Sequence, residues 1–245
     1  MAAQPDRVAV AEVRLTERHG INISVIIPTL NEAEHLEKTL AQIPRSHDPT
    51  RIEILISDGG SRDASLQIAA DYTDLIVKGS AGRAAQMNRA AALAKGEWLL
   101  FLHADSWLPE YWQASILKSR QWGFFPLRLS GQHWGFRVIE KAICLRSAIT
   151  RVATGDQGLF FRRDVFQQMG GFDDIPIMED IAISKKARQI STPDIARCAM
   201  VTSSRRWQQN GIFKTILLMW SLRLAFWLGI SPVRLHRLYY PHHCR

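Results

Sequence analysis

Short apolar runs punctuate the first half of the chain, and each run ends in polar residues. The runs occupy positions 23–27, 52–56 and 98–102, and they are followed by Pro28-Thr29, Ser57-Asp58 and His103-Ala104-Asp105. Runs of this length, rich in Ile, Val and Leu and without alternation, predict strands buried on both faces of a parallel sheet. Ligands of such sheets bind at the carboxyl ends of the strands. We therefore expect the three polar ends to meet in one crevice.

Helices are predicted between these strands. Apolar residues at helical spacing indicate a helix over 31–43, and a second helix begins at Ser61 or Asp63, both favoured capping residues. A short strand over 75–78 and an Ala-rich helix over 83–95 follow. This alternation predicts right-handed βαβ units and an α/β fold.

The pattern weakens between residues 107 and 154, where only a helical stretch near 138–149 stands out. Beyond it the sequence predicts a strand over 159–162, a helix over 163–169, a helix from about 178 to 189 and an apolar helix over 212–230. We expect three parts: a polar lead (1–21), a catalytic domain (22–208), and an apolar helix with a basic, aromatic tail (209–245).

Composition narrows the class of protein. The chain has 245 residues, of which 47% are hydrophobic, enough for the full core of one α/β domain. Its formal net charge of +8 favours a phosphorylated substrate, a lipid headgroup surface or nucleic acid as partner, although a basic surface kept for solubility also explains it. The 3 cysteines are far apart, and residues 1–22 lack the apolar core of a signal peptide, so we expect a reducing, cytoplasmic location.

Six segments in order carry a resemblance to a known family. They read ISVIIPTLNE, ILISDGGSRD, GRAAQMNRAA, WLLFLHADS, GLFFRRDVFQQMGGFDD and MEDIAISKK. This set, over residues 22–190, resembles the family 2 glycosyltransferases of GT-A fold, and within them a small bacterial subgroup with His-Ala-Asp in place of the usual Asp-x-Asp. The resemblance implies a mostly parallel central sheet flanked by helices, to which the sequence adds a C-terminal apolar helix.

The resemblance also implies a reaction. A sugar moves from a nucleotide diphosphate sugar, most commonly a UDP-sugar, to an acceptor hydroxyl, usually with inversion and a divalent cation. A hard cation suits a diphosphate leaving group, and Asp105 is the expected ligand of Mn²⁺ or Mg²⁺. Because side chains alternate in an extended segment, His103 points to the same side as Asp105 and supports the metal or the phosphates, which gives Mn²⁺ more weight. The residues implied for the donor are Thr29, Glu32, Asp58, Arg83, Asn88 and Asp105.

An acidic pair is the implied base. Direct displacement needs one carboxylate to take the proton of the attacking hydroxyl, and the resemblance assigns this role to Asp180, with Glu179 orienting it or contacting the acceptor. Asp156 and Gln157 are expected to touch the sugar or acceptor. Arg206 and Trp207 match the end of the Gln-x-x-Arg-Trp motif of processive members; its leading Gln is absent, which argues against processive synthesis. Helix capping, turn bonds and plain surface positions remain alternatives for all of these residues.

The apolar stretch over 212–230 would be about 28 Å long as a helix, nearly the thickness of a bilayer core. Arg223 lies near its middle, where a charge costs roughly 2.5–3.5 kcal/mol, so a solitary span is disfavoured. We expect a helix that lies on the membrane, with packing on the domain or in a dimer as the alternative. The basic, aromatic tail suits anionic headgroups, which points to the inner face of the cell membrane and a lipid-like acceptor.

Two other classes of protein remain possible from the sequence. A nucleotidyltransferase-like enzyme usually has a Gly-rich loop with a cation after its first strand, and residues 28–32 have neither. A non-catalytic module that binds nucleotide sugars or nucleic acid is the third reading. The acidic residues expected in one crevice would repel phosphates without a metal, so we expect no nucleic acid partner.

Overall fold

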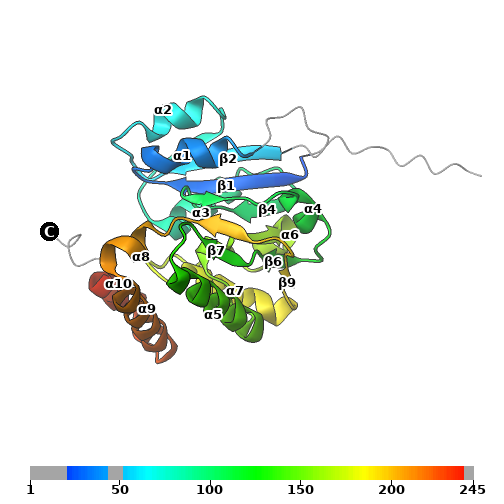
Figure 1. Ribbon diagram of the computed structural model, residues 1–245. Coiled ribbons are helices and arrows are strands. Elements are labelled where there is room, and N and C mark those ends of the chain that lie inside the picture. Colours follow the sequence, from blue (N-terminus) through cyan, green and yellow to red (C-terminus); the bar gives the residue numbers. More distant parts are fainter. Residues whose placement is uncertain (1–20, 44–51, 240–245) are drawn as a thin grey trace, which may run out of the picture.

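The computed structural model describes residues 21–43 and 52–239, in which one seven-stranded sheet has the order β3-β2-β1-β4-β8-β6-β9 (Figure 1). Nearly all of the predicted polar lead, most of the loop before the second strand and the last six residues of the predicted tail lie outside the described residues. The mostly parallel sheet flanked by helices confirms the predicted α/β fold class.

The first half of the sheet is parallel, as predicted. It contains β1 (Ile23–Thr29), β2 (Ile52–Asp58), β3 (Ile76–Lys78) and β4 (Trp98–Phe101), paired in register with one another. Val25 and Ile27 pack with α1 (Ala33–Leu40) and α2 (Ser65–Ala70), whereas Ile26 packs with α3 (Arg83–Ala91) on the other face. Burial on both faces explains why these strands read as continuous apolar runs.

The second half contains short strands that the sequence did not reveal. β8 (Leu159–Arg162), which was predicted, runs antiparallel to both β4 and β6 (Trp122–Phe124), and β9 (Asp194–Ile195) pairs with β6. A separate three-stranded sheet contains β5 (Ser106–Trp107), β10 (Met200–Thr202) and β7 (Leu127–Leu129). Strands of two or three residues are too short to show a periodicity, so the predictions missed them.

Helices cover the second half on its lower side in Figure 1. The α5 helix (Trp134–Thr150) begins before the predicted 138–149, because His133 accepts a hydrogen bond from the Gly135 N–H at its start. The remaining elements are α4 (Trp112–Leu117), the short helix η1 (Gly155–Gln157), α6 (Arg163–Gln168), α7 (Glu179–Ile190) and α8 (Arg205–Asn210).

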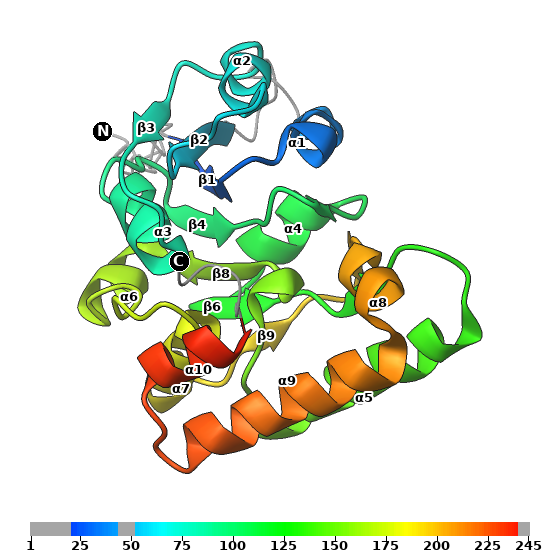
Figure 2. The same ribbon diagram turned by 90° about the vertical axis from the view of Figure 1, so that its left-hand side faces the viewer.

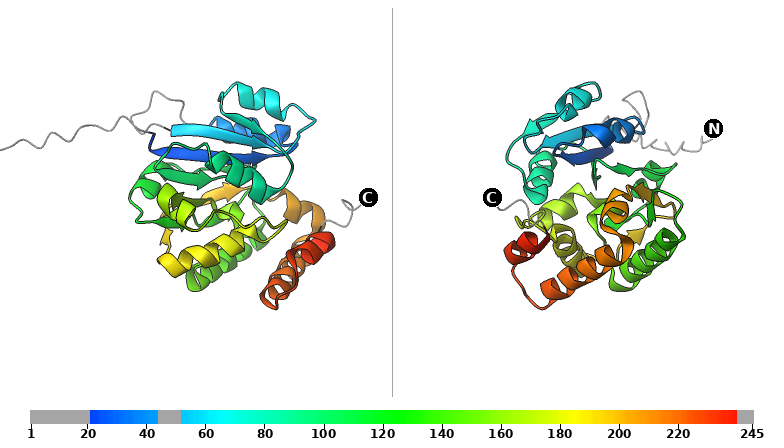
Figure 3. Two further views of the ribbon diagram at one scale, coloured as in Figure 1. Left: turned by 180° about the vertical axis from the view of Figure 1, so that it is seen from behind. Right: turned by 60° about the vertical axis from the view of Figure 1, so that its left-hand side comes forward.

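The predicted single apolar helix over 212–230 is wrong in its extent. The α9 helix (Ile212–Trp227) ends two residues before Gly229, whose φ of +85° suits glycine, and α10 (Pro232–Tyr239) then turns back (Figure 2). Leu222 and Leu235 are buried in one cluster with Met178 and Ile181, so this helical hairpin packs on the start of α7. Seen from behind in Figure 3, the hairpin lies at the edge of the molecule. Within the described residues, no helix has the length and apolar character needed to cross a bilayer.

Candidate active site

The carboxyl ends of β1 and β2 are held together by a residue that the sequence analysis did not single out. The side-chain amide of Gln86 donates to the carbonyl oxygens of Thr29 (2.9 Å) and Ser57 (2.7 Å). Gln86 is buried on the apolar side of α3, where a lone amide among alanines could have indicated such a clamp. Thr29, predicted to line the nucleotide pocket, is itself buried, and its hydroxyl bonds the Ile27 carbonyl oxygen at 3.4 Å.

The loops that follow β1 and β2 are fixed by side-chain bonds. The buried carboxylate of Asp58 accepts the N–H groups of Gly60 (2.8 Å) and Ser61 (3.1 Å). Asn31, with a φ of +54°, accepts the Arg62 N–H at 2.8 Å and so ties the first loop to the second. These bonds preorganise the rim at the carboxyl ends of β1 and β2. The donor role that the resemblance implies for Asp58 stays a prediction.

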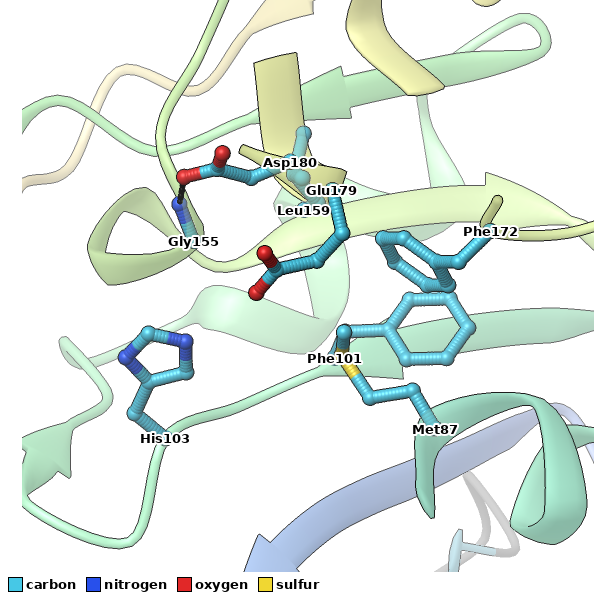
Figure 4. A pocket seen from close by; sticks show the side chains of 8 residues that line it. All are labelled: Met87, Phe101, His103, Gly155, Leu159, Phe172, Glu179 and Asp180. Carbon is cyan, nitrogen blue, oxygen red and sulfur yellow. Dashed lines mark hydrogen bonds between the residues drawn. The ribbon is translucent and has the colours of Figure 1, made fainter. Parts of the chain in front are cut away.

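A small pocket opens beside the end of β4 (Figure 4). A Cβ on Gly155 would lie 2.6 Å from Nε2 of His103, so only glycine allows the imidazole to pack there. The Gly155 N–H donates to Oδ2 of Asp180 at 2.8 Å, and η1 thereby joins the end of β4 to the start of α7. The lining residues are Met87, Phe101, His103, Gly155, Leu159, Phe172, Glu179 and Asp180.

The His103-Ala104-Asp105 segment is not extended, contrary to the alternation argument. The Ser106 N–H bonds the His103 carbonyl oxygen at 3.1 Å and closes a turn, so the two side chains need not share a side. Thr39 fixes this turn by donating to the Ala104 carbonyl oxygen at 2.7 Å. The Asp105 carbonyl oxygen accepts the Ser203 N–H at 3.1 Å, which brings the segment after β10 over the strand ends.

Glu179 and Asp180 start α7 in contact with two different parts of the site. Burial, and then the neighbouring charge of Asp180, raises the pKa of Glu179, while Arg83 opposes the shift from 3.6 Å. The Asp180 carboxylate accepts two backbone N–H groups, those of Gly155 and Ile181. The structure thus brings together three predicted residues, with Arg83 on one side of the acidic pair.

The remaining acidic residues form a concentrated negative charge. Burial and Asp105 raise the pKa of Glu32, whereas Arg205, His35 and Arg83 lower it. Arg205 lies 3.9 Å from Glu32, a contact that the sequence analysis missed. Burial, together with Asp180 and Asp105, raises the pKa of Asp156 despite a hydrogen bond from Thr154. Among the described residues, Oδ1 of Asp156 is buried without a hydrogen-bond partner.

This charge fits a cation that is shared with a substrate. No cluster of three or more His, Cys, Asp or Glu side chains in the described chain would hold a metal by itself. Mg²⁺ and Mn²⁺ that act on phosphates are commonly held by one or two carboxylates together with the phosphate oxygens. Asp105, whose charge raises the pKa of both Glu32 and Asp156, lies near both of them and fits that role.

Other predicted site residues have structural contacts. The Asn88 amide bonds both the N–H and the carbonyl oxygen of Phe172, at 2.9 and 2.8 Å. Gln157 has no exposed surface, and its Oε1 accepts from Thr154 and Ser147. Trp207 packs with Leu127, Leu129 and Phe136 beneath α5, away from the pocket, and the side chain of Arg206 lies outside the described residues.

Comparisons with known proteins agree with this geometry. Residues 24–122 match the sequence model of glycosyl transferase family 2. The PGL/p-HBAD biosynthesis glycosyltransferase of Mycobacterium tuberculosis is 31% identical over 166 residues, which cover 61% of this chain and 62% of that relative. The chain thus spans less than two thirds of the relative's own length.

Solved structures share the fold at low sequence identity. TarS of S. aureus in complex with UDP has a TM-score of 0.60 and 19% identity, covering 75% of this chain and 60% of that chain. Mannosyltransferase PcManGT from Pyrobaculum calidifontis, in complex with GDP-Man and Mn²⁺, has a TM-score of 0.56 and 19% identity, covering 75% of this chain and 57% of that chain.

The chain is thus similar over residues 24–122 to glycosyl transferase family 2 and over 166 residues to a named glycosyltransferase, and it shares the fold of the solved structures. These similarities do not separate out the His-Ala-Asp subgroup, which stays a prediction.

Proposed function

We propose that this protein transfers a sugar from a nucleotide diphosphate sugar to an acceptor hydroxyl, with inversion and with a divalent cation. The observation that carries the proposal is the contact between the end of β4 and the start of α7, where Gly155 links His103 to the carboxylate of Asp180. It places a carboxylate opposite the strand ends at which the donor of a parallel sheet binds. The neighbours that hold UDP or GDP-Man with Mn²⁺ support a nucleotide-sugar donor.

In this mechanism the Asp180 carboxylate takes the proton of the acceptor hydroxyl. The hydroxyl oxygen bonds the anomeric carbon as the bond to the diphosphate oxygen breaks on the opposite face, and the configuration inverts. The N–H groups of Gly155 and Ile181 fix the direction in which the carboxylate points. Positioning of this kind gives general base catalysis its effect.

The charge that leaves with the diphosphate needs a cation. Asp105, with His103 and Glu32 nearby, would hold Mn²⁺ or Mg²⁺, which supplies Lewis acid stabilisation of the leaving group. Arg83 at the start of α3 faces the same crevice through its pairing with Glu179 and adds a guanidinium for a phosphate oxygen.

An apolar face supports a lipid-like acceptor at a membrane surface. Phe213, Trp220 and Trp227 follow one another at seven-residue spacing along α9 and are 71–86% exposed. Trp134 and Ile149 are similarly exposed on α5, which runs beside α9 in Figure 2. Exposed basic residues on the same hairpin suit anionic headgroups; they are Lys214, Arg234 and Arg237. We place the enzyme at the inner face of the cell membrane on this ground.

The test is metal-dependent release of a nucleoside diphosphate. A panel of nucleotide sugars is incubated with the full chain in Mn²⁺, in Mg²⁺ or with a chelator, with and without lipid vesicles. One donor should turn over with metal, and turnover should be lost in Asp105→Ala and Asp180→Asn. Donor binding without turnover under every condition would favour a non-catalytic binding module instead.

A further inference from the structure

Two arginines that no motif contains lie near the proposed base, Asp180. Arg146, on α5, donates to the Ser147 hydroxyl at 2.8 Å and approaches Oε1 of Gln157 at 3.5 Å. Gln157 belongs to the same turn, η1, whose first residue bonds Asp180. Arg146 therefore reaches the site from the side of η1.

Arg223 reaches it from α9. Its neighbour Leu222 is buried against Met178 and Ile181, which flank the acidic pair at the start of α7. Arg223 itself is half-buried, and within the described residues it has neither a hydrogen bond nor a carboxylate oxygen within 4.0 Å. Arg223 is therefore a guanidinium, with five N–H donors, that no protein group of the described residues holds in place.

The two guanidinium groups also affect each other. Burial lowers the pKa of both, and Arg223 further lowers that of Arg146, which falls to about 10. The negative charges of Asp156 and Asp180 raise the pKa of Arg146. Both oxygens of Asp180, however, already accept backbone N–H groups. Nε of Arg146 is buried without a partner among the described residues. Two partly desolvated cations, one of them with a buried unpaired Nε, thus lie within electrostatic range of each other.

We propose that Arg146 and Arg223 bind a phosphate group of the acceptor, beside the hydroxyl that Asp180 deprotonates. The inference rests on the proposed function and names its substrate class, a phosphate ester that carries the reacting hydroxyl. Paired guanidinium groups bind phosphate oxygens through bidentate hydrogen bonds. The donor diphosphate has separate contacts, because Arg83 pairs with Glu179 and Arg205 with Glu32 on the side of the strand ends.

Binding of inorganic phosphate to the full chain tests the proposal without any turnover. Calorimetric titration compares the wild type with Arg146→Gln and Arg223→Gln. Matched controls are Arg151→Gln after α5 and Lys141→Gln on α5, both exposed positions. Phosphate affinity should fall at least tenfold in the first two variants and stay unchanged in the controls, while binding of UDP with Mn²⁺ stays unchanged in all four. Arg146→Lys, whose charge is kept, should retain more affinity than Arg146→Gln.

Two results would overturn the assignment. Equal phosphate binding in wild type and both glutamine variants would remove the arginines from any anion site. Loss of UDP binding in these variants would give the arginines to the donor diphosphate instead. If the proposed transferase activity is wrong, no donor turns over, but arginine-dependent phosphate binding can still be observed. The two failures are therefore distinguishable.

The source of the phosphate is resolved by a second arm. Glycerol 3-phosphate in solution is compared with vesicles of phosphatidylcholine that contain a minor share of phosphatidic acid, against pure phosphatidylcholine. If the arginines are needed only for binding of glycerol 3-phosphate, the acceptor is soluble. If they are needed for stronger binding to the vesicles with phosphatidic acid, the acceptor carries a lipid phosphate. Independence from both arginines in both arms contradicts the proposal.

Discussion

The two halves of the sheet hold their site residues in different ways. In the first half, β1, β2 and β4 are paired in register, so hydrogen bonds of the backbone bring the strand ends together. In the second half the site residues stand on η1 and α7 and are held by side-chain contacts with α5 and α9. The same division holds for apolar surface, since exposed Trp and Phe side chains gather on α5 and α9. In the proposed function the first half holds the donor on a rigid platform, and the second half contacts the acceptor.

Removing the base in the second half should have the largest effect. Asp180→Asn keeps the shape of the side chain and abolishes its proton affinity, so the transfer rate should fall roughly 10²–10⁴-fold. The rate of nucleoside diphosphate release in the presence of acceptor measures this. Asp164→Asn, an exposed acid on α6, is the matched control. A transfer rate within a few-fold of wild type in Asp180→Asn would remove Asp180 from the chemistry.

Breaking the apolar face comes next. The double variant Trp220→Ser and Trp227→Ser should lower partition onto anionic vesicles roughly tenfold or more, since burial of one large apolar side chain contributes about 1.5–3 kcal/mol. Vesicle sedimentation measures the partition. Leu75→Ser with Leu93→Ser removes exposed apolar residues from the first half and should leave partition unchanged. If both double variants sediment like wild type, the apolar face does not contact lipid.

A substitution at Asn88 tests where the halves join. Its amide satisfies both backbone groups of Phe172, so Asn88→Ala should cost roughly 1–3 kcal/mol of unfolding free energy with little change in donor KM. Denaturant unfolding and donor kinetics measure the two quantities. Gln42→Ala, which removes an exposed hydrogen bond from a residue just after the end of α1 to the Lys38 carbonyl oxygen, is the control. If the variant instead has a raised donor KM and unchanged stability, Asn88 contacts the donor, as the resemblance implies.

The smallest expected effect is a pH-dependent one at Glu179. Its pKa in the folded protein is raised above 4.5, so the folded state binds more protons than the unfolded state over the window just above pH 4.5, and stability falls as the pH rises through it. Glu179→Gln should therefore melt a few degrees above wild type at neutral pH and match it below pH 4.5. Thermal melts across pH measure this, with exposed Glu97→Gln as control. A variant that melts below wild type at neutral pH would show that the pairing with Arg83 outweighs burial.

Much of the first half could be predicted from the sequence. Its strands are buried on both faces, so each appears as an uninterrupted apolar run, and the polar residue after each run marks the crevice. The prediction was weaker where the local backbone conformation determines the direction of a side chain. His103 and Asp105 were expected to share a side, but the turn closed by Ser106 cancels the alternation on which that expectation depends.

The second half could be predicted only where a strand or helix is long enough. β8 and the start of α7 were found, whereas β6, β7 and β10, at 3 residues each, carry no period. Arg146, Arg223 and Gln86 were assigned no site role from the sequence, because their contacts depend on packing between elements that are distant in sequence. Gln157 was expected at the acceptor, yet burial inside its own turn is visible only in three dimensions.

The antiparallel insertion of β8 has a consequence for folding. Leu159 pairs with Phe101 across roughly sixty residues of intervening chain, so a long loop must close before this contact forms. β6 and β9 join the main sheet only through β8. The crevice between the halves therefore does not exist until β8 has docked on β4, and contacts of such long sequence separation form slowly.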